Sequence, residues 1–161
     1  MGENKINPNV LSFIGLANEY CMALSNVYET EKEEFVAEML RLLPRIYITM
    51  SDVRAEELSD EEDYYNNFSS YVDEDYYESI RRGVESIMGE DDTFLETFEE
   101  DMKYSDTPIA ASISESLADL FQSLFNFVET IKEAPQEMIP LALVAVMTVT
   151  IGLVVIRSWK A

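Results

Sequence analysis

The chain contains no histidine and only one cysteine, and these two absences exclude most of the common site chemistries. Histidine is the most frequent general base and a frequent zinc and iron ligand, so histidine-dependent catalytic pairs and iron sites cannot be built here. One thiol can neither close an internal disulfide nor supply a cysteine-rich zinc site. No glycine-rich phosphate loop or nucleophile elbow occurs. The sequence therefore predicts no catalytic, cofactor-binding or metal-ligating residues.

Glycine and proline are also scarce, with five of each among 161 residues. An all-β fold needs many tight turns, and these two residue types build most of them, so the composition favours helices. A hydrophobic content of 47% in a chain of this length is enough for one domain with its own core. No charged-then-apolar signal pattern opens the N-terminus, which predicts a cytoplasmic location for the bulk of the chain.

Basic residues are few, and the 11 lysines and arginines face 32 acidic residues, for a net charge of −21. All 32 acids lie within the first 137 residues beside nine basic ones, so this part carries −23. Such a surface repels nucleic-acid phosphates and anionic lipids, and we expect no nucleic-acid partner. Two interpretations of the charge remain open: a solvated, self-repelling surface, or an acidic face for a basic protein partner.

Apolar residues recur at three- and four-residue spacing in five segments, which predicts an all-α bundle of about five helices over residues 9–134. The predicted helices cover residues 10–26, 30–50, 73–88, 93–102 and 107–133. The connection over residues 54–70 shows no period, and we expect its aromatic residues to pack against the bundle.

Several residues predict where these helices begin and end. Thr30 with Glu33 has the spacing of a capping box, Asp73 is a predicted N-cap, and Gly89 is a natural stop. Thr107 followed by Pro108 predicts the start of the last helix. Pro44 lies inside the second segment and lacks an amide hydrogen, so we expect a kink or a short break near Leu43. Glu78 and Arg82 are spaced for an exposed ion pair.

Four groups of residues invite a functional interpretation, and a structural one fits each better. The carboxylate runs 73–75 and 90–92 carry calcium-type ligands but lack the loop pattern that follows them in a calcium site, so helix caps explain them. Cys21 lies on an apolar helix face and is predicted to be a buried, inert thiol. The remaining two groups are the carboxylates Glu96, Glu99, Glu100 and Asp101, read as a solvated face, and the tyrosines Tyr64, Tyr65, Tyr71, Tyr76 and Tyr77, read as half-buried bundle residues.

Four stretches together resemble an uncharacterised family of helical bacterial proteins that is known only as a domain of unknown function. They are LSFIGLANEYC, EFVAEMLRLLPRIYITMSDV, VDEDYYESIRRGVESIMGEDD and LETFEEDMKYSDTPIAASISESLADLFQSLFNFV. The resemblance runs from about residue 11 to residue 137, and it implies an all-α, soluble bacterial protein. It implies no activity and no functional residues. After Ile139 the sequence departs from the amphipathic ending that the resemblance leads us to expect.

The C-terminal tail, residues 138–161, has no charge between Met138 and Ile156. These 19 residues nearly span a hydrocarbon core of about 30 Å, so the tail is a candidate transmembrane helix that would anchor a cytoplasmic domain in the inner membrane. Two alternatives are a buried terminal segment and a frame-shifted terminus of a soluble cytoplasmic protein. On the anchor interpretation, a truncation after Glu137 should be soluble.

The favoured function is a non-enzymatic acidic interaction module formed by residues 1–137, with the tail 138–161 as a membrane tether. The alternative from another class is a small carboxylate-dependent hydrolase, which would need a concave site and one carboxyl with a raised pKa. The sequence does not determine the activity, the partner or the oligomeric state.

Overall fold

The computed structural model describes residues 8–53, 70–96 and 109–133, together with Ile139, Ala142, Leu143 and Val146. Four α-helices dominate this part of the chain: α1 (Pro8–Ser25), α2 (Lys32–Asp52), α3 (Glu74–Met88) and α4 (Ile113–Glu133). Two 3₁₀ turns, η1 (Val27–Glu29) and η3 (Gly89–Asp92), and a two-stranded sheet of β1 (Thr93–Glu96) and β2 (Ile109–Ser112) complete it. The predicted mainly helical fold is confirmed, with four described helices instead of about five.

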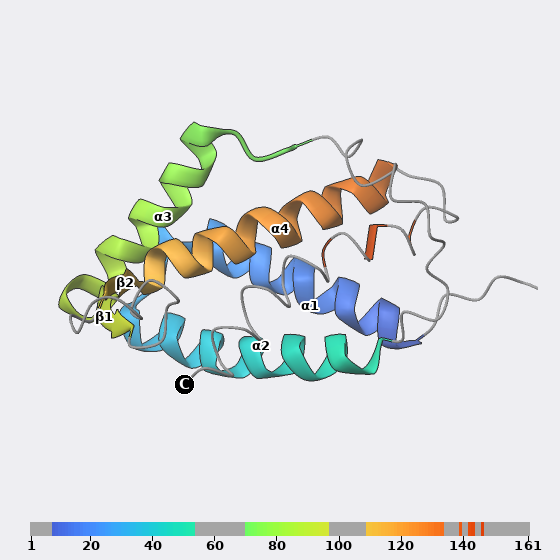
Figure 1. The fold of residues 1–161 in the computed structure, drawn as a ribbon, viewed down its shortest axis with the longest axis horizontal. Helices are drawn as coiled ribbons and strands as arrows, with labels where there is room; N and C mark the ends of the chain where they lie inside the picture. The colour runs from blue at the N-terminus through green and yellow to red at the C-terminus, as the bar shows by residue number, and fades with distance from the viewer. Residues whose placement is uncertain are drawn as a thin grey trace, which may run out of the picture.

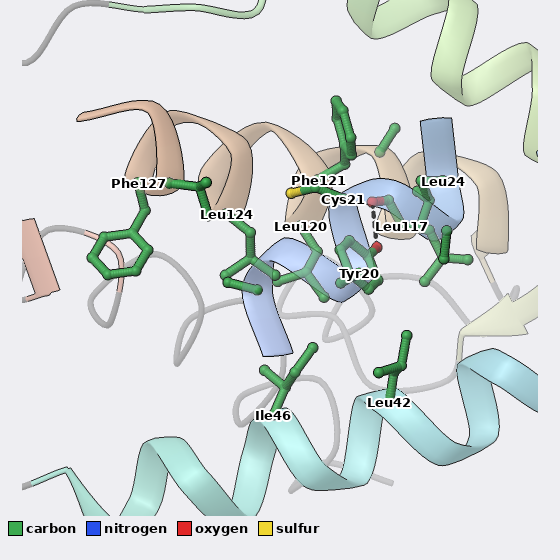
Figure 2. Close-up of a cluster of buried hydrophobic side chains, with 14 of the residues drawn as sticks. Tyr20, Cys21, Leu24, Leu42, Ile46, Leu117, Leu120, Phe121, Leu124 and Phe127 are labelled. Atoms are coloured by element: carbon green, nitrogen blue, oxygen red, sulfur yellow. Dashed lines mark hydrogen bonds between the residues drawn. The ribbon is translucent and has the colours of Figure 1, made fainter. Parts of the chain in front are cut away.

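The core lies where α1 packs between α2 and α4 (Figure 1). Leu42 and Ile46 point from α2 towards α1, while Phe121 and Leu124 come from α4 (Figure 2). All four are at most 2% exposed, as the three- and four-residue spacing of the apolar residues requires. Helix α3 packs against α4 and against η1.

The short predicted helix over residues 93–102 is wrong for its first four residues, which form strand β1. Thr93 pairs with Ser112 and Glu96 with Ile109 in an antiparallel register. Helix α4 therefore begins at Ile113, six residues after the predicted cap Thr107. Ser112 acts as the cap instead, since its Oγ accepts a hydrogen bond of 3.2 Å from the Glu115 amide.

Two of the predicted helix boundaries are confirmed. The Asp73 carboxylate accepts a 2.8 Å hydrogen bond from the Tyr76 amide at the start of α3. Gly89 ends α3 with a φ of 58°, a conformation that glycine adopts without a steric penalty.

The predicted capping box at Thr30 is wrong. Helix α2 begins at Lys32, and the Thr30 hydroxyl donates a 2.9 Å hydrogen bond backwards to the Asn26 carbonyl. Because the Thr30 hydroxyl is bound to the preceding turn, it does not cap α2. Glu31 occupies the N-cap position and makes no side-chain hydrogen bond there. Of the kink or short break expected near Leu43, the break is absent, since α2 runs from Lys32 to Asp52 with Pro44 inside it.

Four residues of the C-terminal tail pack against the helical core. Ala142, Leu143 and Val146 are 4–5% exposed, and the partly buried Ile139 packs against the same cluster. Their spacing of three, one and three residues is that of one helix face. Within the described residues, no helix is long and apolar enough to cross a membrane. These four residues therefore match the buried-segment interpretation, and the rest of the predicted span lies outside the described residues.

We expect Leu143→Ala to lower the free energy of unfolding by about 2–4 kcal/mol, because it removes buried methyl groups and leaves a cavity. Leu40→Ala, at a position 71% exposed, is the control and should change it by less than about 0.5 kcal/mol. Urea unfolding followed by circular dichroism measures both. Equal effects would mean that the tail contributes nothing to the core.

A second test concerns the contact between α3 and η1. A Cβ atom at Gly83 would lie 2.5 Å from Val27 Cγ1 and 3.0 Å from Tyr28 Cε2. Gly83→Ala should therefore destabilise the protein by about 1–3 kcal/mol through overpacking. A Cβ atom at Gly15 in α1 would meet no other atom within 4 Å, so Gly15→Ala should stabilise by up to about 1 kcal/mol. Urea unfolding measures both changes in the free energy of unfolding. If Gly83→Ala and Gly15→Ala changed it in the same direction, the close approach at Gly83 would be contradicted.

Candidate functional site

One concentration of charge in the described residues lies where the start of α2 meets the end of α3. The Lys32 ammonium group donates to Asp91 Oδ2 at 2.6 Å and to the Met88 carbonyl oxygen at 3.0 Å. Six exposed acidic residues lie within three positions of Lys32 or Asp91 in the sequence, and we call them the acidic end: Glu29, Glu31, Glu33, Glu34, Glu90 and Asp91.

The helix dipoles favour the acids of the acidic end that lie on α2 and oppose those that follow α3. Glu33 and Glu34 lie in the first turn of α2, where the helix dipole stabilises negative charge. Glu90 and Asp91 follow the C-terminal end of α3, where the dipole disfavours it. Lys32 offsets that cost by binding both the last carbonyl of α3 and Asp91.

Tertiary contacts hold the two parts of the acidic end together. The Tyr28 hydroxyl donates a 2.7 Å hydrogen bond to the Ser79 carbonyl, which ties η1 to α3. Gly83 allows η1 to approach α3 closely. The hydrogen bond from Lys32 holds the pKa of Asp91 below its usual value, so this carboxyl stays ionised.

The third acid of the run 90–92 has a different role. Asp92 is 5% exposed, and its two oxygens accept hydrogen bonds of 2.7 Å from the amide and the hydroxyl of Ser114. Ser114 lies in the first turn of α4, so Asp92 caps this helix from 22 residues away. Within the described ranges, no group of three or more acidic or cysteine residues could hold a metal ion.

The cations of α3 are occupied by neighbouring carboxylates. Arg81 binds Glu78 at 3.0 Å and Glu85 at 3.1 Å. Arg82 binds Glu78 at 3.3 Å, which confirms the predicted pair. The hydrogen bonds from Arg81 lower the pKa of Glu78. These exposed pairs compensate charge locally and add little stability.

Three tyrosines of the predicted cluster, Tyr71, Tyr76 and Tyr77, join α3 and the residues before it to α4. Tyr77 donates to Asp119 at 2.6 Å, and Tyr71 donates to Glu133 at 2.8 Å. Tyr76 lies edge-on to Phe121 and Phe125, with ring centroids 5.5 Å apart. The prediction that these residues are half-buried members of the bundle is confirmed, while Tyr64 and Tyr65 lie outside the described residues.

Cys21 is 5% exposed, as predicted, and burial raises the pKa of its thiol to about 12. A thiol with such a pKa is not a thiolate nucleophile at neutral pH. The hydrolase hypothesis placed Glu96, Glu99, Glu100 and Asp101 on one helix. Glu96 is instead in strand β1, and the other three lie outside the described residues.

These observations define a small helical protein with an acidic surface, and the comparisons identify its family. A family model described as Domain of unknown function (DUF5063) matches residues 4–148, so the chain belongs to this family. The match is longer than the sequence indicated and includes residues 138–148. Residues 149–161 of the C-terminal tail lie outside the match.

A solved structure shares the fold. The chain is similar to the crystal structure of protein BF1032 from Bacteroides fragilis, with a TM-score of 0.74 and 28% sequence identity. The alignment covers 96% of this chain and 85% of that one. Among curated proteins, none matches this chain significantly.

The buried hydroxyl of Tyr20 gives the fold a dependence on alkaline pH. This hydroxyl donates a 2.7 Å hydrogen bond to the Leu117 carbonyl, and burial raises its pKa well above the usual value of 10. The folded protein therefore resists ionisation that the unfolded chain undergoes near pH 10, and stability is lost as pH rises above that value. The raised pKa of Cys21 adds to the same decline.

We expect Tyr20→Phe to be less stable than wild type at pH 7, by about 1 kcal/mol for the lost hydrogen bond. Between pH 9 and 11.5 the free energy of unfolding of Tyr20→Phe should fall less steeply than that of wild type, because the variant lacks the buried hydroxyl that ionises only in the unfolded chain. Leu40→Ala, at an exposed position without an ionisable group, should follow the wild-type slope. Urea unfolding at a series of pH values measures this, and parallel slopes for wild type and Tyr20→Phe would contradict it.

Proposed function

We propose that this protein is a non-enzymatic interaction module whose acidic end binds a basic protein partner. The observation that carries the proposal is the imbalance at that end: six exposed acidic residues adjoin one ammonium group. Lys32 is already bound to Asp91 and to the Met88 carbonyl, so most of the negative charge there is uncompensated. A surface of this kind accelerates and orients the approach of a positively charged partner.

The chemistry of the described carboxyls supports binding over catalysis. A carboxylate hydrolase needs one acid with a raised pKa. The two carboxyls with clear shifts, Glu78 and Asp91, have lowered pKa values because cations donate hydrogen bonds to them. A lowered pKa keeps a carboxyl ionised, which suits an electrostatic contact.

The proposal also includes a soluble, cytoplasmic protein in preference to one anchored by residues 138–156. The packing of Ala142, Leu143 and Val146 against the helical core supports this choice, because those side chains would be withdrawn from the core in a transmembrane helix. Binding of a basic partner then needs no membrane.

A matched pair of charge variants tests the proposal. Glu33→Gln/Glu34→Gln/Glu90→Gln removes three charges from the acidic end, and Glu74→Gln/Asp75→Asn/Glu115→Gln removes three from exposed first-turn positions elsewhere. The probe is a fluorescein-labelled, lysine-rich peptide titrated with the full chain at low salt. We expect the first variant to bind about tenfold more weakly and the control less than threefold more weakly, since each exposed contact contributes about 0.5 kcal/mol.

Raising the salt concentration should weaken wild-type binding and reduce the difference between the two variants. Equal losses in both variants at low salt would mean that the charge acts as a diffuse, solubilising field. In that case the acidic end is not a binding site.

A further inference from the structure

Helix α2 carries a second surface of different character from the acidic end. Leu40 is 71% exposed and Ile48 is 58% exposed, although both are large apolar side chains. Pro44, between them in the sequence, is also exposed. The core contacts of α2 come from other positions, such as Leu42 and Ile46, which point towards α1 (Figure 2). Folding within the described residues therefore leaves this face of α2 open to solvent.

The exposed residues form two parallel rows. Residues four apart stack into ridges along a helix, so Leu40, Pro44 and Ile48 make an apolar ridge about 12 Å long. Arg41 and Arg45 make the neighbouring ridge, and both are exposed. We call these five residues the α2 face. In Figure 1, α2 lies at the lower edge of the molecule.

The two arginines differ from the other described cations. Lys32, Arg81, Arg82 and Lys132 each lie within 3.3 Å of a carboxylate oxygen. In the described parts of the chain, Arg41 and Arg45 have no such ion pair, although Glu38 precedes Arg41 by three residues. On a protein with 32 acids and 11 bases, two adjacent uncompensated arginines beside an apolar ridge are a specific chemical feature.

We propose that the α2 face binds an acidic amphipathic helix of a partner protein. The apolar side chains of that helix pack into the grooves beside the Leu40–Ile48 ridge, and its carboxylates bind the guanidinium groups of Arg41 and Arg45. This surface is separate from the acidic end. It binds an acidic partner, whereas the acidic end binds a basic one.

Two other occupants fit the charges less well. An anionic lipid surface is repelled by the net charge of −21. In an antiparallel pair of α2 helices from two copies, the same flank of each helix meets, so the arginine ridges would face each other. Like-charge contact disfavours that arrangement.

The test uses the full chain and a designed probe, an 18-residue fluorescein-labelled helix with leucines four residues apart and glutamates on the flanking row. A matched peptide carries lysine in place of each glutamate. Fluorescence anisotropy should show that the acidic peptide binds, whereas the affinity of the basic peptide, which the acidic end can bind, should be the same for wild type and for Leu40→Ser/Ile48→Ser. Arg41→Ala/Arg45→Ala and Leu40→Ser/Ile48→Ser should each weaken binding of the acidic peptide about tenfold. Arg82→Ala/Lys132→Ala, the control with the same charge change at paired cations, should weaken it less than twofold.

Three results would overturn the proposal. The first is an acidic peptide that fails to bind, or that binds equally well to wild type and to Arg41→Ala/Arg45→Ala. The second is tighter binding of the basic peptide to this face, shown by loss in Leu40→Ser/Ile48→Ser. The third is a dimer in sedimentation equilibrium that Leu40→Ser/Ile48→Ser dissociates, which would make a second copy the occupant. None of these results bears on the acidic end, because its variants carry different substitutions.

Discussion

Helix α1 lies between α2 and α4 and gives each of them an apolar surface to pack on (Figures 1 and 2). Phe13, Tyr20 and Leu24 are completely buried, and Phe13 contacts Phe127 with ring centroids 5.4 Å apart. Tyr20 restricts how α1 and α4 can pack, because its hydroxyl donates a hydrogen bond to the Leu117 carbonyl inside the core. A buried hydroxyl without a partner is costly, so this bond fixes how α1 lies along α4.

The burial of α1 also has to offset the self-repulsion of a chain with a net charge of −21. The described ion pairs are exposed or only partly buried, and surface pairs contribute about 0–1 kcal/mol each. They reduce repulsion between neighbours without supplying the main stability. Carboxylates that serve the fold are bound in other ways, as Asp92 caps α4 and Asp119 accepts from Tyr77. Most other described acidic residues are exposed and contribute to the negative charge of the surface.

Sequence reasoning predicted the structure correctly where interactions between residues close in the chain determine it. Asp73 and Gly89 bound α3 as predicted, because a cap and a left-handed glycine act through nearby backbone groups. The strand β1 was missed because Phe94 and Leu95 fit a helical period as well as an extended one. The start of α4 had a readable signal, the Ser112–Glu115 capping-box spacing, which competed with Thr107–Pro108 and prevailed.

Tertiary relationships account for what sequence reasoning could not reach. The cap from Asp92 to Ser114 joins residues 22 positions apart, and the acidic end exists only because η1 packs against α3. The tail shows a different difficulty. Its apolar residues are continuous, so the sequence does not show which of them pack on the core, and only the structure identifies Ala142, Leu143 and Val146 as buried. In the same way, Arg41 and Arg45 are visible in the sequence, but their lack of carboxylate partners is not.

One rigid helix carries parts of both proposed binding surfaces. Glu33 and Glu34 lie in the first turn of α2. Arg41 lies 8 and 7 residues further along, about 11–12 Å away at the helical rise, and Arg45 lies 12 and 11 residues along, about 17–18 Å away. Charges in solvent are screened over about 8 Å at physiological ionic strength. The negative field of the acidic end therefore weakens before it reaches the arginine ridge, and an acidic partner at Arg41 and Arg45 experiences mainly the local positive charge. At low salt the screening length grows beyond these separations, and the two surfaces oppose each other. The spacing set by α2 thus lets two surfaces of opposite sign work on one small, strongly acidic protein.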